Sequence, residues 1–141
     1  MIPLPQELSP AITYQPIGVV SSRLVEPAPP EDMRGHLSDL VLHAHFSPAV
    51  AELAVGDHIW VIYHLHRLES WDERLLPRLF TWRTPSRPNP LGITLTRVIA
   101  TSGSTITVIG LDAIDGSPIL DIKPYKSIFD QPPVEPQGDS S

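Results

Sequence analysis

The sequence lacks cysteine, long apolar runs and a recognisable export signal. Without cysteine, disulfide bonds and thiolate metal sites are excluded, and a reducing compartment is compatible with the composition. No apolar stretch approaches the roughly 20 residues that a membrane-spanning helix requires. Segment 1–10 has neither a basic start nor a long apolar centre, so it does not read as a signal peptide. These absences predict a cytoplasmic protein with no membrane partner.

Aromatic residues and glycines are also scarce. Aromatic residues make up 6% of a chain that is 41% apolar, so aliphatic side chains must supply most of the core. Seventeen prolines stand against eight glycines. Because proline removes an amide donor and breaks helix interiors, short strands joined by stiff loops are favoured over long helices. A length of 141 residues suits one domain.

Alternation of apolar and polar residues indicates a mostly β protein. We expect a flexible N-terminal segment (1–11), a single β-barrel domain (12–129) and a disordered tail (130–141). Ser47-Pro48 predicts a short helix to about Ala54, stopped by Gly56. The predicted strands are 12–20, 37–46, 58–66, 93–99, 105–111 and 119–122, with loops at 25–35 and 67–92 and a hairpin turn at 102–104. This pattern favours a small antiparallel β-barrel with one or two short helices. Neither βαβ alternation nor a G-x-G-x-x-G motif is present, which argues against a doubly wound nucleotide-binding fold.

Charge is distributed unevenly along the chain. The net charge is −6, which argues against coating nucleic acid through bulk electrostatics. Eight of the ten basic residues nevertheless lie between Arg67 and Lys126. A local basic face on an acidic protein is one interpretation, and arginines that merely solvate a surface are the other.

Two segments have the residue types of a ligand site. In segment 83–92 three prolines and a glycine stiffen a path that carries Arg83, Arg87 and Asn89, and a carboxylate or phosphate is the natural partner of each arginine. In segment 111–125 the alternation places Asp121 and Lys123 on one strand face, where they can pair with each other or with a ligand. The alternatives are an ordinary arginine-bearing loop and an edge-strand ion pair.

The histidines form two H-x-H pairs. His43 and His45, and likewise His64 and His66, each project from one strand face, which is a sensible arrangement for zinc or iron. No carboxylate lies near either pair at ligand spacing, and the sequence does not make the strands neighbours. We therefore predict no metal site and keep a metal-binding barrel as an alternative.

Taken in order, these motifs resemble those of the TrmO family, also described as TsaA-like or YaeB-like. Residues 56–64, GDHIWVIYH, resemble that family's "fsHiwvlf-fh" strand. Residues 80–92, FTWRTPSRPNPLG, are close to "FATRSPFRPNPIG", and residues 110–125, GLDAIDGSPILDIKPY, are close to "glDllDGTPvlDIKPY". The resemblance covers about residues 14–126, and the R-P-N-P-[IL]-G and D-I-K-P-Y blocks together are highly specific.

The resemblance implies a homodimeric barrel that binds S-adenosylmethionine near the subunit interface. It also implies N6-methylation of threonylcarbamoyladenosine at position 37 of tRNA. By matching position, the residues that shape the cofactor site would be Arg83, Arg87, Asn89, Pro90, Leu91, Gly92, Leu111, Asp112, Lys123 and Pro124.

An amide-like nitrogen needs a base to become a nucleophile. We expect His66, Asp121 and Tyr125 to serve catalysis, with His64 as a further candidate base. The chain departs from the family pattern on the substrate side: Arg78 replaces a glycine, Thr81-Trp82 replaces Ala-Thr, and Ser86 replaces an aromatic residue. The alternatives are a methyltransferase of a small molecule and a non-catalytic barrel that binds S-adenosylmethionine or metal.

Overall fold

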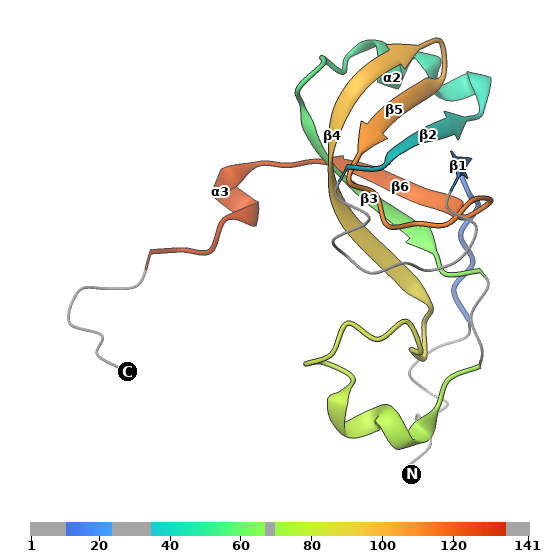
Figure 1. Ribbon diagram of the computed structural model, residues 1–141, viewed down its shortest axis with the longest axis vertical. Helices are drawn as coiled ribbons and strands as arrows, with labels where there is room; N and C mark the ends of the chain where they lie inside the picture. The colour runs from blue at the N-terminus through green and yellow to red at the C-terminus, as the bar shows by residue number, and fades with distance from the viewer. Residues whose placement is uncertain (1–10, 24–34, 67–69, 135–141) are drawn as a thin grey trace.

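The fold is a closed barrel of six strands in the order β1-β2-β5-β4-β3-β6, with every neighbouring pair antiparallel (Figure 1). The computed structural model describes residues 11–23, 35–66 and 70–134. The predicted small antiparallel barrel with few short helices is confirmed. The strands are β1 (Gly18–Ser22), β2 (Leu37–Leu42), β3 (His58–His64), β4 (Leu91–Ser102), β5 (Thr105–Ile109) and β6 (Pro118–Pro124). The helices are η2 (Ala44–Phe46), α2 (Ser47–Ala51), η3 (Glu73–Arg78) and α3 (Ser127–Asp130).

The core is aliphatic, as the composition predicts. In β3 the buried residues Ile59, Val61 and Tyr63 alternate with partly exposed ones, because successive side chains of a strand point to opposite faces. The only buried threonine of the described residues, Thr96, donates its hydroxyl to the Ile59 carbonyl at 3.1 Å. The rest of the core comprises Val20, Leu40, Leu42, Val50, Val98, Ile106, Val108, Leu111, Ala113 and Ile119.

Several predicted boundaries are wrong, each for a local reason. β1 begins at Gly18 rather than at residue 12, because Pro16 has no amide to donate to a ladder. β2 ends at Leu42, and the chain turns at His43 into η2, so His45 lies on a helical turn rather than on a strand. α2 ends at Ala51, before the predicted Ala54, whose amide instead donates to the Asp57 carboxylate.

The predicted hairpin is confirmed, with Gly103 at φ +60° between β4 and β5. Asp115-Gly116 also forms a turn, in which Gly116 has φ +83° and the Asp115 carboxylate accepts the Ser22 amide. Segments 1–10, 24–34 and 135–141 lie outside the described residues, so the flexible N-terminal segment, most of the 25–35 loop and most of the tail stay predictions.

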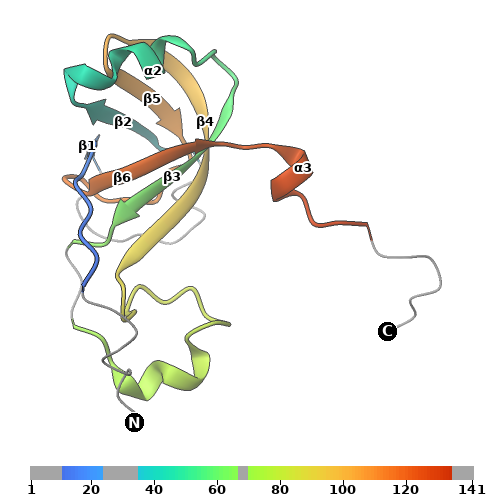
Figure 2. The ribbon, with the colours of Figure 1, turned by 180° about the vertical axis from the view of Figure 1, so that it is seen from behind.

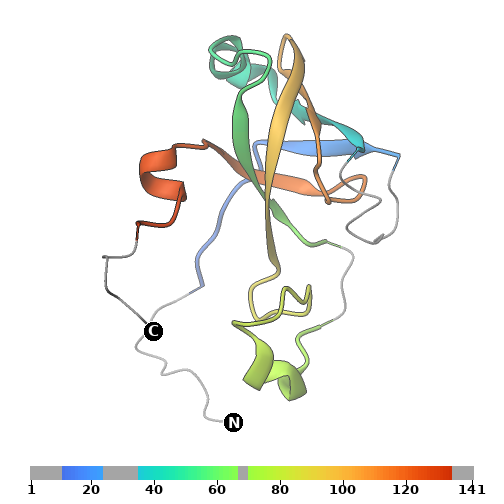
Figure 3. The ribbon, with the colours of Figure 1, turned by 60° about the vertical axis from the view of Figure 1, so that its left-hand side comes forward.

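Two segments project from the barrel (Figures 1, 2 and 3). η3 and the loop after it hang beyond the end of the barrel at which β4 begins, and α3 stands away from its side. No helix among the described residues is long and apolar enough to cross a membrane.

Candidate functional site

The two predicted ligand segments lie on either side of β3. The arginine loop runs directly into β4, which pairs with β3 so that Ile62 faces Ile93 and Trp60 faces Leu95. On the opposite edge, β6 places Asp121 beside Ile62 and Lys123 beside Trp60. Since neighbouring strands are 4.7–4.9 Å apart, β4 and β6 are separated by about 10 Å across β3. Leu91 and Ile93 of β4 therefore share one sheet face with Asp121 and Lys123 of β6.

This outer face combines an apolar stripe with an ion pair. The stripe consists of Trp60, Ile62, Leu91, Ile93 and Leu95, of which the last three are exposed. Beside it, Lys123 Nζ lies 3.7 Å from Asp121 Oδ2, and both side chains are about half exposed or more. An ion pair in such contact with water is weak and can exchange its partner for a ligand. The contiguous exposed apolar side chains are typical of a surface that another molecule covers.

Tyr125 lies at one end of this outer face. Its amide donates to the His58 carbonyl at 3.0 Å, which continues the β6–β3 pairing beyond Pro124. Its ring lies 6.5 Å from that of Trp60 and 6.4 Å from that of His58, centroid to centroid. Tyr125 therefore packs against the first residues of β3.

At the other end of β3, Asp112 forms a cluster with Tyr63 and Thr94, here called the mouth cluster. The Tyr63 hydroxyl donates to Asp112 Oδ1 at 2.5 Å, and the Thr94 hydroxyl donates to the same oxygen. Asp112 is exposed, and its Oδ2 accepts no hydrogen bond from any residue that the structure describes. The cluster thus presents one carboxylate oxygen, firmly positioned, to an incoming donor.

Burial is the main influence on the pKa of the Tyr63 phenol. Tyr63 is only 3% exposed, and burial, followed by its hydrogen bond to Asp112, raises its pKa well above the ordinary value of 10.0. The hydrogen bond with Thr94 and the charge of Arg83 lower this pKa but do not outweigh burial. Tyr63 thus remains a neutral donor at any physiological pH.

Gly92 lies under the Tyr63 ring. A Cβ at this position would overlap the ring atoms Cε2 and Cζ of Tyr63, which pairs with Gly92 across β3 and β4. The glycine of the P-N-P-L-G block therefore lets the phenol cross the β4 backbone to reach Asp112. Tyr63 and Thr94 were absent from the sequence-predicted site. The sequence did contain one signal for Tyr63: the alternation of β3 puts it on the buried face. A buried tyrosine needs a hydrogen-bond partner for its hydroxyl.

The arginines of the loop mainly hold the loop itself. Arg87 donates to three backbone carbonyls, those of Leu79 at 2.5 Å and of Trp82 and Thr84 at 3.2 Å each. Arg83 donates through one guanidinium nitrogen to the Ile93 carbonyl at 3.0 Å, and its side chain is otherwise exposed. Asn89 is exposed, and its carbonyl accepts the Leu91 amide at 2.8 Å. Arg83 and Asn89 thus keep donors for a ligand, whereas the Arg87 guanidinium is engaged in the fold.

The three residues expected to serve catalysis are not brought together within one chain. His66 follows β3 at the mouth-cluster end, where its Nε2 lies 3.5 Å from the point that a Cβ on Gly116 would occupy. Tyr125 lies at the other end of β3 and Asp121 between them. Their catalytic roles stay predictions. Among the described residues, no three histidine, aspartate or glutamate side chains are grouped as metal ligands.

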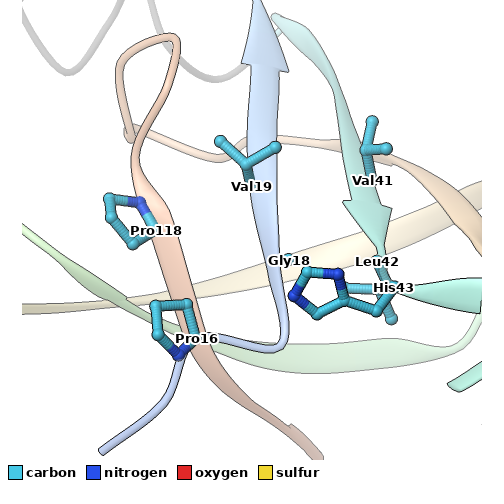
Figure 4. A pocket seen from close by; sticks show the side chains of 7 residues that line it. All are labelled: Pro16, Gly18, Val19, Val41, Leu42, His43 and Pro118. Carbon is cyan, nitrogen blue, oxygen red and sulfur yellow. The ribbon is translucent and has the colours of Figure 1, made fainter. Parts of the chain in front are cut away.

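A separate shallow pocket of about 480 Å³ lies over β1, β2 and β6 (Figure 4). Its walls are Pro16, Gly18, Val19, Val41, Leu42, His43 and Pro118. None of the predicted site residues lines it, and His43 contributes its only ionisable side chain. The pocket is open and almost wholly apolar, so the outer face and the mouth cluster remain the better site.

Comparisons with known proteins identify the family of the chain. The tRNA-methyltransferase O N-terminal domain family matches residues 19–131. A probable S-adenosyl-L-methionine-binding protein of Methanothermobacter thermautotrophicus is 36% identical, covering 84% of this chain and 93% of that protein. One from Pyrococcus abyssi is 32% identical, covering 84% of this chain and 71% of that protein.

Longer relatives match over part of their length. The human tRNA (adenine(37)-N6)-methyltransferase is 36% identical over 58% of this chain but only 21% of its own. The crystal structure of TrmO from Pseudomonas aeruginosa superposes with a TM-score of 0.75 and 26% identity. That match covers 92% of this chain, which spans 63% of the Pseudomonas chain. From the matched residues, the shared barrel and these relatives together, the chain belongs to the tRNA-methyltransferase O (TrmO) family.

Proposed function

We propose that this protein is an S-adenosylmethionine-dependent methyltransferase that methylates N6 of threonylcarbamoyladenosine in the anticodon loop of tRNA. Family membership and the names of the relatives, which state S-adenosyl-L-methionine binding and tRNA adenine-N6 methylation, support the proposal. The observation that carries it is the flanking of β3 by β4, into which the arginine loop leads, and by the aspartate-lysine strand β6. The protein would act in the cytoplasm.

The chemistry of the site fits S-adenosylmethionine. Asp112 offers its unpartnered oxygen to a hydroxyl or amino group, and Arg83 offers a cation to a carboxylate. Lys123 lies on the outer face toward the other end of β3, so it would reach the same ligand from a second chain. The cofactor would supply a methyl group on a positively charged sulfur, and the carboxylates of this chain would favour that charge. The walls would be formed by Asn89, Pro90, Leu91, Gly92 and Pro124, and Arg87 would act by holding the loop in shape. The Leu111 side chain lies in the core, so this residue would take part only through its backbone.

The residues of this chain would orient the acceptor and remove its proton. A carbamoyl-substituted adenine nitrogen is a poor nucleophile until its proton leaves. His66 and Asp121 are the proposed bases, and the Tyr125 hydroxyl would hold the acceptor. In a single chain His66 and Tyr125 lie at opposite ends of β3, so a site that uses both needs a second copy.

A homodimer would meet that need. The exposed stripe of the outer face would be covered by its counterpart, and the ends of β3 from two chains would meet there. Leu95→Glu, which puts a charge in the stripe, should convert the dimer to a monomer in sedimentation velocity. Leu37→Glu, at an exposed leucine of β2, is the matched control and should leave the dimer intact. A monomeric wild-type protein would contradict this part of the proposal.

The decisive assay is transfer of a labelled methyl group from S-adenosylmethionine. We expect turnover on tRNA that carries threonylcarbamoyladenosine and none on the same tRNA without it. The net charge of −6 favours a small acceptor as the second candidate. Turnover on small carbamoylated adenosines with no gain from tRNA would establish that candidate instead.

A further inference from the structure

The projecting segment of residues 70–90, here called the lobe, exposes large aromatic side chains. Phe80 is 92% exposed and Trp82 is 53% exposed. They are separated by Thr81 and belong to the loop after η3, which projects from the barrel together with η3 (Figures 1 and 3). An aromatic ring that is this exposed contributes little hydrophobic stabilisation to the fold. Binding of another molecule explains its presence better than folding does.

Contacts within the lobe hold the Arg78 and Trp82 side chains together. The Arg78 guanidinium carbon sits 4.8 Å from the centre of the Trp82 ring, a cation–π contact. The Trp82 amide donates to the Arg78 carbonyl at 2.9 Å, which closes the turn that carries both side chains. The Ser86 hydroxyl accepts the Asp72 amide at 3.1 Å and ties the two ends of the lobe together. The lobe is therefore a built turn that presents Arg78 and Trp82 together.

The lobe is positively charged in an acidic protein. It carries four arginines and two acids (Asp72 and Glu73). Arg74 pairs with Asp72, and Arg87 donates to backbone carbonyls. Arg83 donates to the Ile93 carbonyl next to the mouth cluster. Arg78 is an exposed cation above an aromatic ring. Aromatic faces interleaved with arginine are what unpaired nucleotides bind, through base stacking and phosphate contacts.

We propose that Phe80 and Trp82 form a stacking site for unpaired RNA bases next to the methylated nucleotide, with Arg78 holding the Trp82 ring and meeting a phosphate. This inference rests on the proposed function, because it supplies the RNA contact that a methyltransferase of net negative charge requires. The aliphatic outer face, where a second copy would dock, is a different surface.

Binding of RNA and of S-adenosylmethionine should be measured separately on each variant. The RNA probe is a fluorescent anticodon stem-loop, compared with a fully paired duplex of the same length. Phe80→Ala and Trp82→Ala should each weaken stem-loop binding about tenfold, since one lost base stack is worth that much. Duplex binding and calorimetric S-adenosylmethionine affinity should stay within twofold. Because the Phe80 ring is almost wholly exposed, its removal does not endanger folding.

Control variants separate stacking from other effects. Leu76→Ala removes an exposed aliphatic side chain from the same lobe and should change stem-loop affinity by less than twofold. Trp82→Phe keeps a stacking face and should retain most of the binding. Arg78→Gln should lower the slope of log affinity against log salt by about one, whereas Trp82→Ala should leave that slope unchanged.

The outcomes distinguish this inference from the proposed function. If the wild type methylates tRNA but both alanine variants keep its KM and stem-loop affinity, the stacking site is refuted and the methyltransferase stands. If the alanine variants change the sedimentation coefficient and not RNA affinity, the lobe binds a second copy and the inference fails. If the wild type binds S-adenosylmethionine but neither binds nor methylates RNA, the tRNA assignment itself fails.

Discussion

Removing the Tyr63 hydroxyl tests how much its hydrogen bond to Asp112 stabilises the fold. Tyr63→Phe deletes a donor that is 2.5 Å from the Asp112 carboxylate and keeps the buried ring. A hydrogen bond to a charged group contributes about 1.5–3 kcal/mol. Asp112 is exposed and keeps Thr94 as a donor, so water can replace part of the loss. We therefore expect the free energy of unfolding to fall by about 1–2 kcal/mol at pH 7, a decrease in Tm of about 3–8 °C.

The same substitution predicts a change at alkaline pH. Because the Tyr63 pKa is raised in the folded protein, the phenol loses its proton more readily in the unfolded chain. The stabilisation from its protonated form is complete below pH 10.0, the ordinary pKa, and is lost as pH rises above that value. The difference in stability between wild type and Tyr63→Phe should therefore shrink above pH 10.

Urea unfolding between pH 7 and pH 11 measures both effects. Tyr14→Phe is the matched control, because Tyr14 is exposed and should follow the wild type throughout. The reasoning would be refuted by a Tyr63→Phe variant as stable as the wild type at pH 7. A stability difference that stays constant up to pH 11 would refute the burial of the phenol.

Two further substitutions probe the segments beside this cluster. Gly92→Ala should lower the free energy of unfolding by about 1–3 kcal/mol, because its methyl group overlaps the Tyr63 ring and the core cannot give way without strain. Unchanged urea unfolding would contradict this packing. Arg87→Lys keeps the charge but cannot donate to three carbonyls. Limited proteolysis within residues 79–90 should therefore become several times faster while the barrel stays folded. Equal cleavage rates would show that the loop does not depend on the guanidinium.

The sequence predicted the barrel because the strand signals were local. Strand β3 alternates through seven residues, and Gly103 marks a tight hairpin turn, so both were found. The start of β1 differed from the prediction because of Pro16, and the end of α2 differed where the Asp57 carboxylate accepts the Ala54 amide. Apolar alternation continues past Leu42 in the sequence, yet the chain turns into η2 there.

Only part of the site could be predicted from the sequence, because no single motif indicates which strands become neighbours. The Arg87 loop and the Asp121-Lys123 strand were both identified, but their convergence depends on β3 lying between β4 and β6. Similarly, the role of Gly92 depends on Tyr63, which lies almost thirty residues earlier in the chain and faces it across the sheet. Sequence spacing indicated that Arg87 binds a ligand, whereas the structure shows its guanidinium engaged with the loop backbone.

Calorimetric titration of the purified protein with S-adenosylmethionine tests the central claim most directly. We expect one cofactor per chain for the wild type, and at least tenfold weaker binding for Asp112→Asn, which removes the charge but keeps the shape of the mouth cluster. Thermal unfolding of the same samples would verify that both are folded. A folded wild type that takes up no S-adenosylmethionine, or an Asp112→Asn variant that binds it as tightly, would contradict the account.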